Sequence, residues 1–127
     1  MTLRVLLVDD SEQFIATARR LLEREGLQVV ATATTGTEAV QRALEQSPDV
    51  SLVDIDLGEE SGFEIVRRLH EIGDDGSSSI LISSHSAEDF VDLVAESPAA
   101  GFLSKSRLSA SAIRDVLAGG GSDRAPG

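Results

Sequence analysis

The 127-residue chain contains no cysteine, which excludes disulfide bonds, zinc sites built on thiolates and thiol nucleophiles. It has only two histidines, too few for a metal site made of histidine alone. No apolar run approaches the ~20 residues that a membrane-spanning helix needs, and the run at 5–8 is too short for the core of a signal peptide. These absences predict a soluble protein of the cytoplasm that does not enter a membrane.

Tryptophan and tyrosine are also absent, and 11 basic residues against 22 acidic ones give a formal net charge of −11. An acidic surface repels phosphate backbones, and no tryptophan or tyrosine is available to stack on bases. We therefore expect no nucleic acid to be bound by this chain alone. The hydrophobic content of 41%, with 26% charged residues, is typical of a globular chain, and the length suits one domain.

Short aliphatic segments alternate with segments of helical periodicity. The expected strands are 3–8, 27–33, 50–55, 80–82 and 100–103. The expected helices are 11–25, 37–46, 61–72, a fourth one capped by Ser86 with Phe90, Val91 and Val94 facing inward, and 109–118. Five such pairs predict an α/β fold, a doubly wound parallel sheet with helices on both faces, over residues 1–118. The glycine-rich segment 119–127 is expected to be a flexible tail or the remnant of a linker.

Acidic residues stand where two of these strands end. Asp9 and Asp10 follow the first strand, and Asp54 and Asp56 come at the end of the third. In a sheet of order 2-1-3-4-5 these strands are neighbours, so Asp9, Asp10 and Asp54 converge at the carboxyl edge, where such sheets bind ligands. Three clustered carboxylates repel one another unless a cation lies among them, and Mg²⁺ or Mn²⁺ suits such oxygen ligands.

Lys105 is the only lysine of the chain and follows the fifth strand, so it would face the acidic cluster from the far side. Simpler interpretations stand beside these. Asp10 or Ser11 fits a helix cap, Ser83 at the end of the fourth strand fits either the site or a cap, and Lys105 fits a solvated side chain. Residues assigned to packing or to the exposed surface are Phe14, Phe63 and Phe90 on helical apolar stripes, His70 on a helix, and Glu59 and Glu60 in a loop.

Taken together, these residues resemble the receiver domain of bacterial two-component response regulators. The segments that carry the resemblance are 6–10, 48–54, the loop to Gly62, 82–84 and 101–105, the last being most similar to the NarL/FixJ-type branch. It covers about the first 118 residues. The resemblance implies a three-layer, doubly wound (βα)5 sandwich of the flavodoxin-like type.

The resemblance also implies that Asp54 accepts a phosphoryl group from a sensor histidine kinase or a phosphotransfer protein. Mg²⁺, with Mn²⁺ as a substitute, would then be bound directly by Asp10, Asp54 and the backbone carbonyl of Asp56, and by Asp9 through water. Acceptance of the group is stoichiometric, so the chain is not expected to be an enzyme beyond slow self-dephosphorylation.

Three further roles come with the resemblance. Lys105 and Ser83 would contact the phosphoryl group. Phe102 would turn inward and change the face formed by the fourth helix, the fifth strand and the fifth helix, which would control a partner or output domain or support a homodimer. The alternative interpretation of Phe102 is a plain core aromatic.

The sequence departs from the family pattern near the site. Gly58 stands where the family usually has proline, which predicts a more flexible loop. Ser106 replaces the proline that commonly follows the lysine. Asp56 adds a carboxylate, and with His85 it flanks the path of attacking water; Ser84 and Gly58 lie beside the site as well.

Two other functions compete with this hypothesis. The Asp54-Ile55-Asp56 spacing matches the nucleophile and general acid of an Mg²⁺-dependent phosphohydrolase of the haloacid dehalogenase type, which would leave Asp9 and Asp10 unexplained. The second competing function is that of a degenerate receiver, which binds partners without accepting phosphate. The complete set of site residues argues against it.

Overall fold

Five parallel strands form the central sheet of the computed structural model, which describes residues 2–73, 77–84 and 90–119. Their order is β2-β1-β3-β6-β7. The strands are Arg4–Val8 (β1), Gln28–Ala33 (β2), Val50–Asp54 (β3), Ser78–Ser83 (β6) and Gly101–Ser104 (β7). Apart from two short hairpin strands, this is the predicted order 2-1-3-4-5, and β1 lies directly beside β3.

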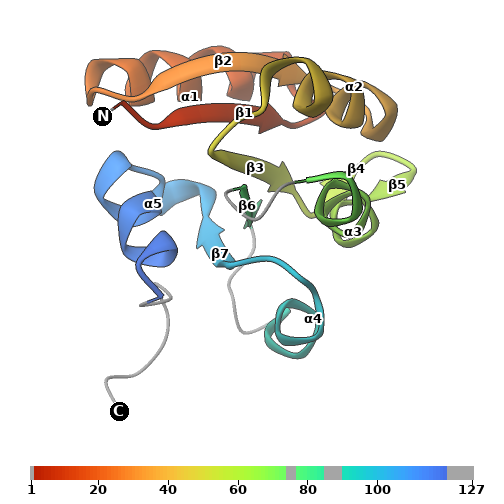
Figure 1. The fold of residues 1–127 in the computed structure, drawn as a ribbon. Helices are drawn as coiled ribbons and strands as arrows, with labels where there is room; N and C mark the ends of the chain where they lie inside the picture. Colours follow the sequence, from red (N-terminus) through yellow and green to blue (C-terminus); the bar gives the residue numbers. More distant parts are fainter. Residues whose placement is uncertain (1, 74–76, 85–89, 120–127) are drawn as a thin grey trace.

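Helices cover both faces of this sheet (Figure 1). One core cluster joins the sheet to α1 (Glu12–Arg24) and α5 (Ala110–Leu117), and the other joins it to α2 (Gly36–Gln46), α3 (Gly62–Ile72) and α4 (Val91–Glu96). Residues 5–8 of β1 point alternately into the two clusters, which is why this part of the strand is aliphatic throughout. The predicted three-layer, doubly wound α/β sandwich is confirmed.

Hydroxyl side chains fix where four of the helices begin. Ser11 Oγ accepts a hydrogen bond from Phe14 N at 3.2 Å, so Ser11 caps α1. The other three caps are Thr35 for α2, Ser61 for α3 and Ser109 for α5. Each of these helices therefore begins at the carboxyl edge of the sheet, after the connection that follows a strand.

The fourth helix differs in part from the expectation. Its N-cap is Phe90, and Val91 is 59% exposed, so the prediction that Val91 faces the core is wrong. Phe90 and Val94, four residues apart, do pack against the core, because one turn separates them on the same face of the helix. The predicted cap Ser86 lies outside the described residues.

The segment between Asp54 and α3 forms a hairpin where a loop was expected. Its strands are β4 (Asp56–Leu57) and β5 (Glu60–Ser61), which pair antiparallel. Gly58 has a φ of +63°, which suits the first central position of a type II′ turn. Proline, whose φ is fixed near −65°, cannot adopt this conformation. The glycine therefore permits a tight turn at the position where the family pattern has proline.

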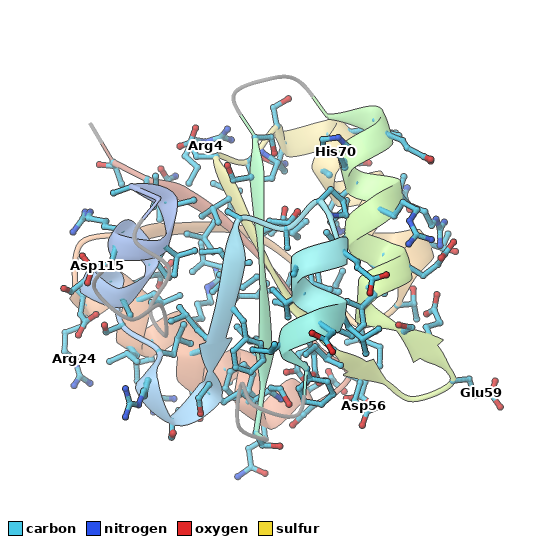
Figure 2. The ribbon with its side chains drawn as sticks, turned by 90° about the horizontal axis from the view of Figure 1, so that it is seen from below. Arg4, Arg24, Asp56, Glu59, His70 and Asp115 are labelled. Carbon is cyan, nitrogen blue, oxygen red and sulfur yellow. The ribbon has the colours of Figure 1, made fainter. Side chains whose placement is uncertain are left out.

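Glu60 ties this hairpin to a neighbouring helix. Its Oε1 accepts a hydrogen bond from Gly36 N at 2.9 Å, at the N-terminus of α2, where the helix dipole favours a negative charge. The interpretation of Glu60 as an exposed loop charge is therefore wrong. Glu59 is exposed, as expected, and extends away from the fold at the hairpin tip (Figure 2).

The C-terminal helix α5 ends at Leu117, and residues 120–127 lie outside the described part of the chain. The division into a domain over 1–118 and a tail thus stays a prediction. Among the described helices, none has the length and apolar character required to cross a bilayer.

Replacing Glu60 by alanine should lower the free energy of unfolding by about 1 kcal/mol, because the N-terminus of α2 loses a charged acceptor. Urea unfolding followed by circular dichroism measures this. The matched control is Glu59→Ala, which should change stability by less than about 0.5 kcal/mol, as surface substitutions generally do. Equal effects of the two substitutions would contradict the role of Glu60.

Candidate functional site

Polar residues from four strands meet at the carboxyl edge of the sheet. Asp9 follows β1, Asp54 ends β3, Ser83 ends β6 and Lys105 follows β7. The register makes these ends level: Val8 pairs with Val53, Asp54 with Ile82, and Ser83 with Ser104. The fold therefore brings the predicted strand ends together at one edge of the sheet.

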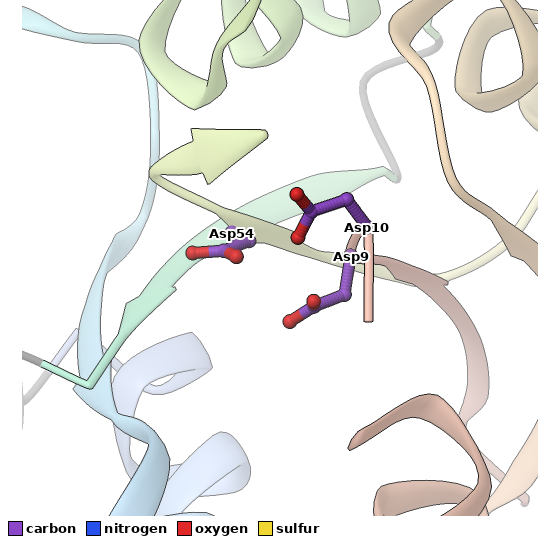
Figure 3. A group of neighbouring side chains, drawn as sticks. All are labelled: Asp9, Asp10 and Asp54. Atoms are coloured by element: carbon purple, nitrogen blue, oxygen red, sulfur yellow. The ribbon is translucent and has the colours of Figure 1, made fainter. Parts of the chain in front are cut away.

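Three carboxylates form the centre of this edge. One oxygen from each of Asp9, Asp10 and Asp54 lies within 4.8 Å of the other two, and the side chains face a common space (Figure 3). Asp9 is 1% exposed and Asp54 is 5% exposed, whereas Asp10 is exposed. The cluster is thus buried at Asp9 and Asp54 and open to solvent at Asp10.

Lys105 supplies the positive charge next to the cluster. Its Nζ lies 2.6 Å from Asp9 Oδ2 and 3.3 Å from Asp54 Oδ2. Asp9 Oδ2 is buried, and the contact with the Lys105 ammonium is what compensates its charge. One ammonium group faces three carboxylates, and an excess of negative charge remains.

The surroundings shift the ionisation of both partners. Burial raises the pKa of Asp54, and the charge of Asp9 acts in the same direction. The backbone N–H of Asp56, 3.2 Å from Asp54 Oδ1, and Lys105 oppose this without cancelling it. Burial alone would lower the pKa of Lys105, but the hydrogen bond to Asp9 and the charges of both aspartates outweigh it and raise the pKa. The lysine is therefore charged at neutral pH, and the Asp54 carboxylate is destabilised.

These residues fit a divalent cation with oxygen ligands. The three carboxylates carry an excess of negative charge, their oxygens are close enough to share one ion, and the side at Asp10 leaves room for water ligands. A bound cation would oppose the burial and the repulsion from Asp9 that together raise the pKa of Asp54. Asp56 follows Asp54 by two residues and lies on β4. Its side chain points to solvent (Figure 2), so only its backbone is available to contribute to the site.

Other residues predicted for the site are placed as follows. Ser83 is buried at the end of β6, and Ser84 is exposed beside it. Gly58 lies at the cluster, since a Cβ added there would be 3.8 Å from Asp10 Oδ2. His85 lies outside the described residues.

Ser106 lies in a 3-10 turn over Lys105–Arg107. Its hydroxyl and that of Ser104 form a hydrogen bond of 2.9 Å. The described residues contain no cis peptide bond, so none is present at the position where the family commonly has proline.

Phe102 is 6% exposed and belongs to the core cluster on the α2, α3 and α4 face. Its ring centroid lies 6.2 Å from that of Phe90, which in turn lies 6.4 Å from that of Phe63. The packing interpretation of Phe102 therefore holds in this conformation, and its role as a switch stays a prediction.

One residue at the site was missed by the sequence analysis. Phe14, assigned to packing, also has its ring under the Lys105 ammonium, with Nζ 4.3 Å from the ring centroid. A signal was present in the sequence: Phe14 is in the first turn of the helix that follows Asp9 and Asp10, so it lies at the same edge as they do.

The comparison with known proteins agrees with this geometry. The family model of the response regulator receiver domain matches residues 5–117. The chain belongs to this family. The response regulator UvrY of Escherichia coli (strain K12) is 35% identical over 121 residues, which are 92% of this chain and 55% of UvrY. The chain spans about half the length of the curated relatives it matches.

Solved structures of receiver domains are similar as well. A LuxR-family response regulator from Aurantimonas sp. SI85-9A1 superposes with a TM-score of 0.82 at 31% identity, covering 94% of this chain and 87% of that one. The receiver domain of NarL from Mycobacterium tuberculosis gives 0.78 at 26% identity, with 92% and 94% covered. The chain is thus a receiver domain of the NarL/LuxR type, and neither competing function is favoured.

Asp54→Asn should stabilise the metal-free protein at pH 7 by about 1 kcal/mol, because it removes a buried charge that is repelled by Asp9. A carboxyl group with a raised pKa in the folded state destabilises the fold where it is ionised, and this penalty disappears below its unfolded pKa. The gain should therefore shrink as the pH falls.

Thermal unfolding without metal, measured from pH 7 down to pH 4, tests this. Asp56→Asn, at the exposed neighbour, is the matched control and should change the melting temperature little at any pH. A destabilised Asp54→Asn variant would contradict the electrostatic account.

Proposed function

We propose that Asp54 is the phosphoryl acceptor of this receiver domain and that the donor is a phosphohistidine of a sensor histidine kinase or of a phosphotransfer protein. The observation that carries the proposal is the placement of one buried carboxylate, at the end of β3, between an acidic pair and the only lysine. This combination provides a nucleophile, a place for a cation and a counter-charge within one cluster.

In the proposed step an oxygen of the Asp54 carboxylate attacks phosphorus and forms the acyl phosphate bond. The P–N bond to the donor imidazole breaks, and the imidazole leaves with the electron pair. Asp54 Oδ1 is held by Asp56 N and Oδ2 by Lys105 Nζ. Since both oxygens are held before the donor arrives, little orientation remains to be achieved in the transition state.

Mg²⁺ would be held by Asp10, Asp54 and the backbone carbonyl of Asp56, with Asp9 acting through water, and Mn²⁺ suits the same oxygens. When bound, the cation neutralises charge that develops on the phosphoryl oxygens. Lys105 is positioned to move from the aspartates to a phosphoryl oxygen, and the Ser83 hydroxyl, at the end of the adjacent strand, donates a hydrogen bond to another.

The proposed output surface is formed by α4, β7 and α5. Val91 and Leu93 on α4 are 59% and 51% exposed, which favours contact with a partner, an output domain or a second copy of the chain. Phe102 lies on β7 three residues before Lys105 and packs on Phe90 at the start of α4. Movement of Lys105 towards a phosphoryl group would therefore change the conformation of this surface.

Self-dephosphorylation and a cytoplasmic location stay predictions. The competing phosphohydrolase would turn over a phosphate monoester many times, whereas the receiver accepts one phosphoryl group for each chain. The degenerate receiver would accept none.

Incubation with acetyl phosphate and Mg²⁺ should add the mass of one phosphoryl group to the intact protein, because Asp54 is the one proposed acceptor. Asp54→Asn should remain unlabelled, and the control Asp56→Asn should be labelled like the wild type. Intact-mass spectrometry measures this. Full labelling of Asp54→Asn would show that another residue is the acceptor.

Lys105→Arg should slow the phosphorylation of Asp54 by about tenfold with an unchanged circular dichroism spectrum, because the broader guanidinium group does not reproduce the contacts of a compact ammonium. Arg107→Lys, two residues away and exposed, is the control and should leave the rate unchanged. Phosphorylation and partner binding of Lys105→Arg at wild-type levels would refute the role of this lysine.

A further inference from the structure

The positively charged end of Lys105 is held from two directions, and only one of them is an ion pair. Its Nζ contacts Asp9 and Asp54 and also lies 4.3 Å from the centroid of the Phe14 ring. An ammonium group over an aromatic face is attracted by the negative charge of the π-system. The lysine side chain is 19% exposed, so this attraction is weakened by solvent less than at an open surface.

The backbone that carries this ring is linked through Ser11 to the same carboxylate that pairs with the lysine. Asp9 Oδ1 accepts a hydrogen bond from Ser11 N at 2.8 Å, and Ser11 Oγ accepts one from Phe14 N at 3.2 Å. Asp9 Oδ2, meanwhile, is 2.6 Å from Lys105 Nζ. Asp9, Ser11, Phe14 and Lys105 therefore form a closed circuit of contacts around the first turn of α1.

An aromatic ring suits this position for an electrostatic reason. A further carboxylate would also attract the ammonium, but it would add formal charge to a cluster that already holds three carboxylates. The ring attracts the lysine without adding charge or binding a hard cation. Phe14 also packs against the core cluster on the α1 and α5 face.

We propose that Phe14 is a positioning residue for phosphoryl transfer, which orients the Lys105 ammonium through a cation–π contact. The effect on the rate depends on the proposed function, whereas the contact itself does not. Two measurements separate these parts.

The contact is tested by nuclear magnetic resonance on protein labelled with ¹³C-lysine. Lys105 is the only lysine, so a single side-chain spin system reports on it. The ring current of Phe14 should shift the signal of the lysine ε-CH₂ group upfield in the wild type, and this shift should disappear in Phe14→Leu. An unshifted wild-type signal would overturn the proposal whatever the phosphorylation result.

The function is tested by the rate of Asp54 phosphorylation with acetyl phosphate. Phe14→Leu should slow it by about three- to tenfold, the range expected for loss of a partly buried cation–π contact. Phe63→Leu is the matched control at another partly buried phenylalanine and should leave the rate unchanged.

Since leucine also alters packing, phenylalanine analogues carrying one, two and three fluorines at position 14 provide the decisive series. They keep the ring shape while withdrawing its π-electron density, so the logarithm of the rate should fall steadily with each fluorine. A rate unaffected by fluorination, in a protein whose wild type is phosphorylated normally, would reduce Phe14 to a packing role. Absence of phosphorylation in the wild type would refute the proposed function instead, and the nuclear magnetic resonance result would still decide the contact.

Discussion

The ion pair of Lys105 with Asp9 and Asp54 is the interaction on which the site depends. It joins the ends of three strands, β1, β3 and β7, that are far apart in the sequence. Buried carboxylates this close are unfavourable without a counter-charge, and a buried ammonium is equally unfavourable without a partner. The folded chain resolves both problems only partly, because the acidic cluster keeps an excess of negative charge. This excess of negative charge makes the carboxyl edge of the sheet suitable for binding a cation.

The hairpin β4–β5 links this edge to the rest of the fold. It begins directly after the acidic site and turns at Gly58, near Asp10. Its second strand carries Glu60, which binds the N-terminus of α2. The connection after β3 is therefore anchored at both the site and a helix. Gly58 allows the turn through its positive φ, and the hydrogen bond of the Glu60 carboxylate to Gly36 N restrains the second strand of the hairpin.

Membership of the receiver family explains the acidic cluster and the lysine, and the structure adds how the surroundings of the lysine are built in this chain. Asp9 uses its two oxygens for different purposes, one for the start of α1 and one for Lys105. Phe14 in the same helical turn then covers the lysine. The N-terminus of α1, a structural feature in the sequence analysis, is thus also a wall of the site.

The sequence by itself determined the parallel sheet and the two helical layers, and with the sheet order that the receiver resemblance implies it placed Asp9, Asp10 and Asp54 at one edge, with Ser83 and Lys105 at neighbouring strand ends. Periodicity and strand ends are local properties that survive in any parallel sheet. Only the tertiary structure decided the contacts of Glu60 with Gly36 and of Phe14 with Lys105, which join residues 24 and 91 positions apart. The same holds for Val91, whose exposure depends on where the short α4 lies on the sheet. Such contacts depend on how neighbouring elements pack. An amphipathic pattern shows which face of a helix is buried, but it does not show which residue contacts that face.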